Sequence, residues 1–222
     1  MGYEHADACN YTVAACWEFI VPFVGADVAN IGAMSYPKAV DLALHNHLIQ
    51  CETYEEFFDC VKNEIQKESD RIASGINNLW FIPSPMMNVL MDCDINNCGK
   101  YNNFGIHGTG IATAADSLAV VKKYVYEEKS LDKQTLIDAI DDNFESTPEL
   151  LHQLRYEAPK LGNNDDFVDS IATELLDAFA DSLRGKTNCR GGIYRAGTGS
   201  AMYYLWHADA LGSTYGGRYP DE

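Results

Sequence analysis

Amphipathic helices alternate with short extended segments along this chain, and this alternation is the feature that most restricts its fold. The strongest helix signal is the run DDFVDSIATELLDAFADSL, which begins at Asp165. It repeats an apolar side chain at helical spacing, at Phe167, Ile171, Leu175, Phe179 and Leu183. Such spacing places the apolar side chains on one face of a helix. Helices that alternate with strands indicate an α/β fold rather than an all-α fold.

Capping signals predict where other helices begin. Thr53 and Glu56 have the spacing of a capping box at the start of a long helix. Asp132 precedes the run KQTLIDAI, and Pro148 stands at the first helical position of PELLHQL. Residues 111–128, IATAADSLAVVKKYVYEE, predict a further helix. Extended or irregular structure is expected in YTVAACWEFIV, NNLWFIPSPM and IYRAGTGSAMYYLW.

The composition argues against several classes of function. Acidic residues outnumber basic ones 33 to 16, which gives a formal charge of -17. Such a surface repels phosphate backbones and anionic lipid, so we expect neither nucleic acid nor a membrane as a partner. The sequence MGYEHADACN lacks the regions of a signal peptide, and no apolar run is long enough to span a bilayer. Seven irregularly spaced cysteines without a C-x-x-C pair favour free thiols and a cytoplasmic protein.

Cys16 and Glu18 stand two positions apart in the apolar run YTVAACWEFIVPF. In an extended chain such side chains point to the same side, roughly 6–7 Å apart, and could bracket a small substrate. Apolar neighbours keep a thiol neutral, which suits hydrogen-atom exchange better than thiolate attack. They also raise the pKa of a carboxyl group, so that Glu18 could act as acid or base near neutral pH. Taken alone, however, a buried cysteine is usually a small apolar side chain.

Three other patterns are weaker. The HGTG turn, residues 107–110, precedes a helix and could bind an anion, but it lacks the further glycine and the lysine of nucleotide-binding motifs. We therefore favour a plain helix entrance there. Cys93 and Cys98 form a single C-x4-C pair, which is weak evidence for a metal site. His45 and His47 lie in a helical run, where side chains two positions apart diverge. No bound metal is expected.

Several segments resemble those of glycyl radical enzymes, the pyruvate formate-lyase-like family, in the family's order. GYEHADACNYTVAACWE resembles the segment that leads into the C-x-E motif of the active-site cysteine. The later matches are PSPMMNVLMDCDINNCGKYNNFG, GIATAADSLAVVKKYVYEE, APKLGNNDDFVDSIA and GTGSAMYYLWHADALGSTYGGR. The resemblance runs over essentially all of the chain, and it changes the interpretation of Cys16 from structural to functional.

The resemblance implies a radical mechanism of the dehydratase, lyase or decarboxylase type. Cys16 corresponds to the residue that becomes a thiyl radical and takes hydrogen from a small organic substrate, and Glu18 to the acid/base. The bond cleaved would be C–O, C–N, C–S or C–C. The implied partners are the substrate, a radical-SAM activating enzyme that installs a glycyl radical, and a second copy in a homodimer of the complete enzyme. No bound cofactor is expected. Ala15 stands where pyruvate formate-lyase proper has a second cysteine, which disfavours formate C-acetyltransferase-like acyl transfer.

The fold implied by the resemblance is part of a ten-stranded β/α barrel with outer helices. Residues 1–222 would supply the cysteine loop and the second barrel half. The R-V-x-G-[YF] loop that carries the radical glycine is absent from this sequence. We therefore expect a partial domain without turnover on its own. Two alternatives remain open: an inactive fragment or scaffold partner of a separate radical domain, and a small-molecule binder at the HGTG turn.

Overall fold

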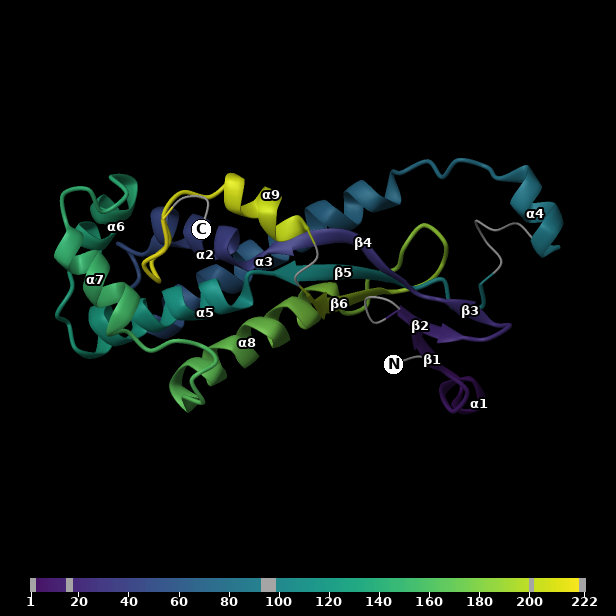
Figure 1. The fold of residues 1–222 in the computed structure, drawn as a ribbon, viewed down its shortest axis with the longest axis horizontal. Helices are drawn as coiled ribbons and strands as arrows, with labels where there is room; N and C mark the ends of the chain where they lie inside the picture. Colours follow the sequence, from purple (N-terminus) through teal and green to yellow (C-terminus); the bar gives the residue numbers. More distant parts are fainter. Residues whose placement is uncertain (1–2, 15–17, 93–98, 200–201, 220–222) are drawn as a thin grey trace.

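Among the residues that the structure describes, the strands form two separate three-stranded sheets (Figure 1). The computed structural model describes residues 3–14, 18–92, 99–199 and 202–219. One sheet is antiparallel in the order β1-β2-β3, with strands Thr12–Ala14, Glu18–Val21 and Gly25–Ala26. The other is parallel in the order β4-β5-β6, with strands Val28–Ser35, Phe104–Thr109 and Tyr194–Thr198. Parallel strands need crossover connections, and helices occupy both crossovers of this sheet.

The helices within the described residues differ widely in length. Before β5 the chain forms α1 His5–Ala8, α2 Tyr36–His47, α3 Tyr54–Asn77 and α4 Pro85–Met91. Between β5 and β6 it forms α5 Ile111–Val120, the π-helix η1 Val121–Glu127, α6 Lys133–Asp141, α7 Pro148–Tyr156 and α8 Asp166–Leu183. Helix α9, Tyr203–Asp209, follows β6. The architecture is therefore mixed α/β, as the sequence predicts.

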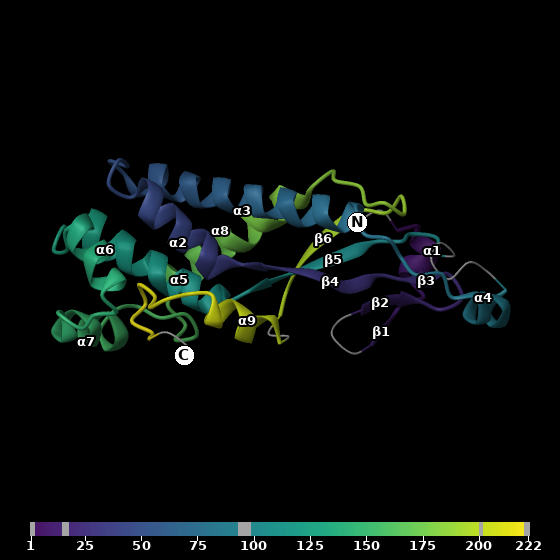
Figure 2. The same ribbon diagram turned by 90° about the horizontal axis from the view of Figure 1, so that it is seen from above.

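Helices α3 and α8 cover one face of the parallel sheet (Figure 2). A Cβ added at Gly32 would lie 3.0 Å from Ile72 Cγ2, so α3 packs directly on β4. The hydroxyl of Tyr194 on β6 donates to the carbonyl of Ala73 on α3 over 3.1 Å. Helix α9 reaches the sheet on the other side, where its His207 contacts Thr109 at the end of β5. The sheet is thus enclosed between helices near its carboxyl edge.

The predicted helix starts are confirmed by their caps. Thr53 Oγ1 accepts the Glu56 N–H over 3.2 Å, and Glu56 Oε2 accepts the Thr53 N–H, which completes the capping box of α3. Asp132 and Asp165 accept backbone N–H groups at the starts of α6 and α8. Each cap satisfies donors that have no partner inside the helix.

The extended and helical predictions need corrections. Within the first extended segment, Thr12–Ala14 and Glu18–Val21 form two antiparallel strands, so the segment is extended as predicted but not one continuous strand. The helix predicted over 111–128 changes from α to π geometry at Val121. Residues 79–84 are irregular, one of the two outcomes predicted, because Pro83 removes a backbone donor that a strand would need; the departure is helix α4, which begins at Pro85. The last extended prediction holds only through Thr198, after which α9 forms.

Candidate functional site

The hairpin formed by β1 and β2 holds the position of the predicted catalytic pair. Ala14 at the end of β1 pairs with Glu18 at the start of β2, so residues 15–17 stand between two paired positions. Cys16 is one of these three and lies outside the described residues. Glu18 is described by its backbone, as the first residue of β2. The roles assigned to both residues therefore stay predictions.

Aromatic rings fix the base of this hairpin. The ring of Phe19, next to Glu18, is stacked on that of Tyr11 at 5.0 Å and packs against that of Tyr3 at 4.6 Å. The backbone N–H of Asp27 donates to the carbonyl of Phe19 over 3.1 Å. Aromatic pairs at such distances add to the stability of apolar contact. The strand that begins with Glu18 is therefore held both by the N-terminal segment and by Asp27, which links β3 to β4.

A buried polar cluster joins the hairpin to the parallel sheet. Asp27 is buried and accepts a 2.5 Å hydrogen bond from the Tyr3 hydroxyl. Arg195 on β6 approaches the same carboxylate to 3.4 Å and lies over the Tyr3 ring at 4.6 Å. Asn103 Nδ2 donates to the Tyr3 hydroxyl over 3.2 Å. Burial, followed by the bond to Asp27, raises the pKa of Tyr3 to about 12, so Tyr3 stays a donor at physiological pH.

The N-terminal segment has a second attachment near the start of β5. Lys100 Nζ lies 2.7 Å from Asp7 and 2.8 Å from Glu4, and the Tyr101 hydroxyl donates to Asp7. Lys100 is the main cause of a lowered pKa at Asp7. Tyr3 and Asp7 belong to the GYEHAD part of the segment that resembles the glycyl radical enzymes. Their contacts show that this segment fixes the hairpin.

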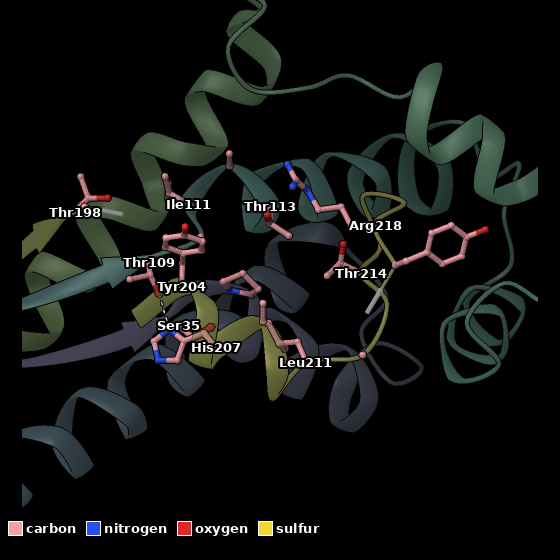
Figure 3. Close-up of a pocket in the computed structure, with 17 residues that line it drawn as sticks. Ser35, Thr109, Ile111, Thr113, Thr198, Tyr204, His207, Leu211, Thr214 and Arg218 are labelled. Carbon is pink, nitrogen blue, oxygen red and sulfur yellow. Dashed lines mark hydrogen bonds between the residues drawn. The ribbon is translucent and has the colours of Figure 1, made fainter. Parts of the chain in front are cut away.

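A separate pocket of about 440 Å³ opens at the carboxyl ends of β4 and β5 (Figure 3). The turn predicted at HGTG is corrected here, because residues 107–109 belong to β5 and only Gly110 lies between β5 and α5. Thr109 and Gly110 line the pocket, together with residues of α5, α9 and the segment 211–219. Gly110 has φ of +74°, and a Cβ there would lie 2.6 Å from the ring of Pro37. This turn therefore needs glycine for its backbone conformation and its close approach to α2.

The polar side chains of the pocket include a paired histidine. Thr109 Oγ1 donates to the carbonyl of Met34 and lies 2.6 Å from His207 Nδ1, the contact dashed in Figure 3. Burial lowers the pKa of His207, which favours a neutral ring whose Nδ1–H donates to Thr109. Thr214 Oγ1 is buried and has no hydrogen-bond partner within the described residues. With Arg218 also at the wall, the pocket combines an apolar lining with several polar groups.

Asp116 on α5 brings together three of the segments that carry the family resemblance. Its carboxylate accepts the backbone N–H of Leu161 over 2.8 Å, and the charges of Lys160 and Arg218 act on it. Burial raises the pKa of Asp116 against these opposing contributions. A Cβ at Gly216 would lie 3.2 Å from Asp116 Cβ, so the G-G-R turn packs closely on α5. Asp116 lies in the run IATAADSLAVV, which carries part of the family resemblance, but the sequence does not predict its contacts with Leu161 and Gly216.

The other sequence candidates are not brought together. On α2, His45 contacts Asp41 and Asp141, whereas His47 approaches Glu64 to 3.9 Å, so the two rings diverge as predicted. Cys93 and Cys98 lie outside the described residues. The described part of the chain contains no group of three or more His, Cys, Asp or Glu side chains placed to hold a metal ion. Nor does any described helix have the length and apolar character needed to cross a membrane.

Comparison with known proteins identifies a protein family that matches this chain. A family model described as pyruvate formate lyase-like matches residues 1–206. The chain is 31% identical over 215 residues to trans-4-hydroxy-L-proline dehydratase of Clostridioides difficile, covering 84% of this chain and 27% of that protein. It is 29% identical over 204 residues to isethionate sulfite-lyase of Nitratidesulfovibrio vulgaris, covering 78% of this chain and 24% of that protein.

Solved structures of dehydratases also match this chain over part of their length. The crystal structure of hydroxyproline dehydratase from Clostridioides difficile, with trans-4-hydroxy-L-proline bound, matches with a TM-score of 0.85 and 25% identity. The match covers 100% of this chain and 32% of that one. The B12-independent glycerol dehydratase of Clostridium butyricum shares the fold with a TM-score of 0.88, at 21% identity, over 31% of its chain. The chain thus spans about a quarter to a third of the length of these relatives.

Proposed function

Because the chain belongs to the pyruvate formate lyase-like family, whose relatives here are glycyl radical dehydratases and lyases, we propose that it is the cysteine-bearing part of such an enzyme. In this proposal residues 1–222 are a partial domain that contributes to a ten-stranded β/α barrel. The substrate is a small organic molecule, and the reaction breaks a C–O, C–N, C–S or C–C bond. A radical-SAM activating enzyme and a second copy in a homodimer are the proposed protein partners.

Cys16 is the proposed hydrogen-transfer residue. A glycyl radical on a segment outside this sequence would supply the acceptor for the hydrogen atom of the Cys16 thiol. As a thiyl radical, Cys16 takes a hydrogen atom from a substrate carbon and becomes a thiol again, leaving the unpaired electron on the substrate. Glu18 accepts the proton of a hydroxyl on that carbon, which favours expulsion of the neighbouring group.

The observation that carries this proposal is the register of the hairpin. Ala14 pairs with Glu18, so Cys16 belongs to a connection of only three residues between paired strand positions. The base of this hairpin is held by Tyr3, Tyr11 and Asp27. Radical transfer requires reacting atoms at close contact, so a rigid support for the hairpin suits the assigned chemistry. Ala15 precedes Cys16, which disfavours the alternative of acyl transfer.

Turnover in a reconstituted system tests the proposal. The chain would be produced anaerobically together with a polypeptide that carries a radical-glycine loop and with a radical-SAM activating enzyme. Candidate substrates would be a hydroxylated amino acid, a hydroxyalkyl sulfonate and a vicinal diol. We expect product with the wild type and with Cys9→Ser, and none with Cys16→Ala or Glu18→Gln. Equal turnover by Cys16→Ala and the wild type would refute the assigned role. Radical formation without product from any variant would favour the inactive-scaffold alternative.

The pocket at the HGTG turn supports a second candidate function, the binding of a small molecule. Its volume of about 440 Å³ suits a small ligand, and Arg218 together with the start of α5 favours an anionic group. Titration with a mononucleotide, followed by the chemical shifts of Thr109 and Ile111, tests it. Saturable shifts that weaken in Arg218→Gln but not in Arg184→Gln, an exposed arginine, support binding. No shifts at millimolar ligand would remove this candidate.

A further inference from the structure

Two cysteines that the proposed chemistry does not use lie side by side at the start of α3. Cys51 Sγ and Cys60 Sγ are 3.9 Å apart. A disulfide bond is about 2.05 Å long, so each sulfur needs to move by only about 1 Å to form one. Both thiols are free in this structure. The other described cysteines, Cys9 and Cys189, are exposed.

The backbone that carries Cys51 is fixed from several directions. Its N–H donates to the carbonyl of His47 over 3.2 Å. Its carbonyl accepts from the Tyr126 hydroxyl over 3.2 Å and from Lys133 Nζ. Two residues later the Thr53 capping box fixes the first turn of α3, and Cys60 follows within the same helix. Because these contacts already hold the backbone on both sides of the pair, little further conformational entropy is lost on bonding.

The two thiols differ in access to solvent. Cys51 is buried, with 7% of its surface exposed, whereas Cys60 is partly exposed. Burial, followed by the contact with Cys60, raises the pKa of Cys51 to about 11. A buried, protonated thiol reacts slowly with an external oxidant, so Cys60, the more exposed thiol, reacts first. Cys51 is then placed to complete the bond from inside.

From this geometry we propose that Cys51 and Cys60 form a reversible disulfide, a modification site independent of the radical chemistry proposed for Cys16. The oxidant class is a low-molecular-weight disulfide, such as oxidised glutathione. The Cys60 thiolate attacks it, forming a mixed disulfide and releasing one small thiol. Cys51 then loses its proton and displaces the second small thiol as the Cys51–Cys60 bond forms. Two protein thiols are oxidised and one small disulfide is reduced to two thiols.

The bond would join the α2–α3 connection to the second turn of α3. This end of α3 lies far from the hairpin of β1 and β2 (Figure 1). Closing a loop of about ten residues restricts the unfolded chain, and for a chain of this length the expected increase in Tm is about 5–10 °C. The modification therefore stabilises the helical body and leaves the proposed catalytic hairpin in place.

Peptide mapping tests the pairing. The reduced chain would be incubated with oxidised glutathione under native conditions, alkylated, and digested with a protease that cleaves after glutamate, which separates Cys51 from Cys60 at Glu52, Glu55 and Glu56. We expect one crosslinked peptide pair, lighter than the sum of the reduced peptides by two hydrogen atoms, in the wild type and in the control Cys9→Ser. The same oxidation in guanidinium chloride should spread crosslinks over many cysteine pairs.

Single variants test the order of the two steps. Cys51→Ser should stop at a mixed disulfide on Cys60, whereas Cys60→Ser should leave Cys51 largely unmodified. Neither variant should show the increase in Tm on oxidation, while Cys9→Ser should show it in full. Recovery of Cys51 and Cys60 as separate peptides from the folded, oxidised wild type would overturn the proposal. The wild-type digest needs no substitution, so this outcome can be read even if a variant fails to fold.

Discussion

Two regions of the molecule differ in how far their apolar side chains are buried: the helical body, made of α3, α5 and α8, and the arm, residues 79–90. In the body, large residues of α3, α5 and α8 such as Phe57, Leu118 and Phe179 are buried against one another. In the arm, Trp80, Ile82, Met86, Val89 and Leu90 are each more than three-quarters exposed. Figure 1 shows α4, which lies within the arm, apart from the helices that pack on the sheet.

The difference teaches that apolar composition alone does not define a core. The helices of the body repeat their apolar residues on one face and meet partners there, whereas the arm contains two prolines and too few residues for a comparable face. Exposed apolar area gains nothing from folding, because burial contributes about 25 cal/mol per Å² only when water is removed. Substitutions should therefore destabilise the chain at buried positions of the body and not at the exposed positions of the arm; Phe81, which packs against Phe104, is the exception within the arm.

The sharpest test compares one aromatic residue from each region. Phe57→Ala removes a fully buried ring from α3 and should lower the free energy of unfolding by about 3–5 kcal/mol. Trp80→Ala removes a ring that is 82% exposed and should change it by less than about 0.5 kcal/mol. Urea unfolding followed by far-ultraviolet circular dichroism measures both. Similar losses in the two variants would mean that the arm is packed in solution.

A smaller loss of unfolding free energy is expected when the buried Asp116 on α5 is replaced. Asp116→Ala leaves the N–H of Leu161 without its acceptor and removes the negative charge beside the partly buried Lys160. The expected loss is about 2–3 kcal/mol. The control is Asp177→Ala on the exposed side of α8, which should stay within about 0.5 kcal/mol of the wild type. Equal unfolding midpoints for the two variants would show that Asp116 does not join these segments.

Sequence patterns predicted local features well and distant contacts poorly. The caps at Thr53, Asp132 and Asp165 were predictable because each side chain bonds to the backbone within three residues. Asp116 and Leu161 are 45 residues apart, and only the fold brings them together. The last extended prediction fails at YYLW, residues 203–206. The pairing of β6 with β5 ends at Thr198, and these later residues form α9 instead.

The candidate site likewise has features that the sequence predicted and contacts that it did not. The resemblance placed the chain in its family because ordered motifs can be read without coordinates, and the family match confirms it. The roles of Cys16 and Glu18 remain predictions. The residues that hold their hairpin could not be foreseen, since Asp27 meets Tyr3 across 24 positions and Arg195 comes from the far end of the chain.

The capping box of α3 provides a test of intermediate size. Thr53→Ala removes the acceptor for the Glu56 N–H and should cost about 1 kcal/mol of folding free energy. Thr173→Ala, at an exposed position within α8, is the matched control and should have little effect. Hydrogen exchange at the amides of residues 54–58 should speed up in Thr53→Ala. Unchanged exchange there would show that the cap does not protect the helix start.

The smallest effect is expected at the attachment of α1, where the partly buried Asp7 meets the more exposed Lys100. Lys100 lowers the pKa of Asp7 in the folded chain below that of the unfolded chain. A depressed carboxyl pKa contributes stability that is present above the unfolded pKa, which is about 3.9. This contribution is lost as the pH falls through the folded pKa. Asp7→Asn should therefore lower Tm slightly at pH 7, and its difference from the wild type should shrink as the pH falls below about 3.9 and continues through the lowered folded pKa.

Salt separates this pair from other causes of the same change. An exposed ion pair weakens as salt screens it, so the difference between Asp7→Asn and the wild type at pH 7 should shrink between low salt and 1 M sodium chloride. Asp59→Asn, which removes an exposed partner of Lys62 within α3, is the matched control. The Asp59–Lys62 pair lies entirely within α3 and does not involve α1. That variant should therefore leave the chemical shifts of residues 4–8 unchanged, whereas Asp7→Asn should move them. A Tm difference for Asp7→Asn at pH 7 that does not shrink in 1 M sodium chloride would mean that the carboxylate charge does not attach α1.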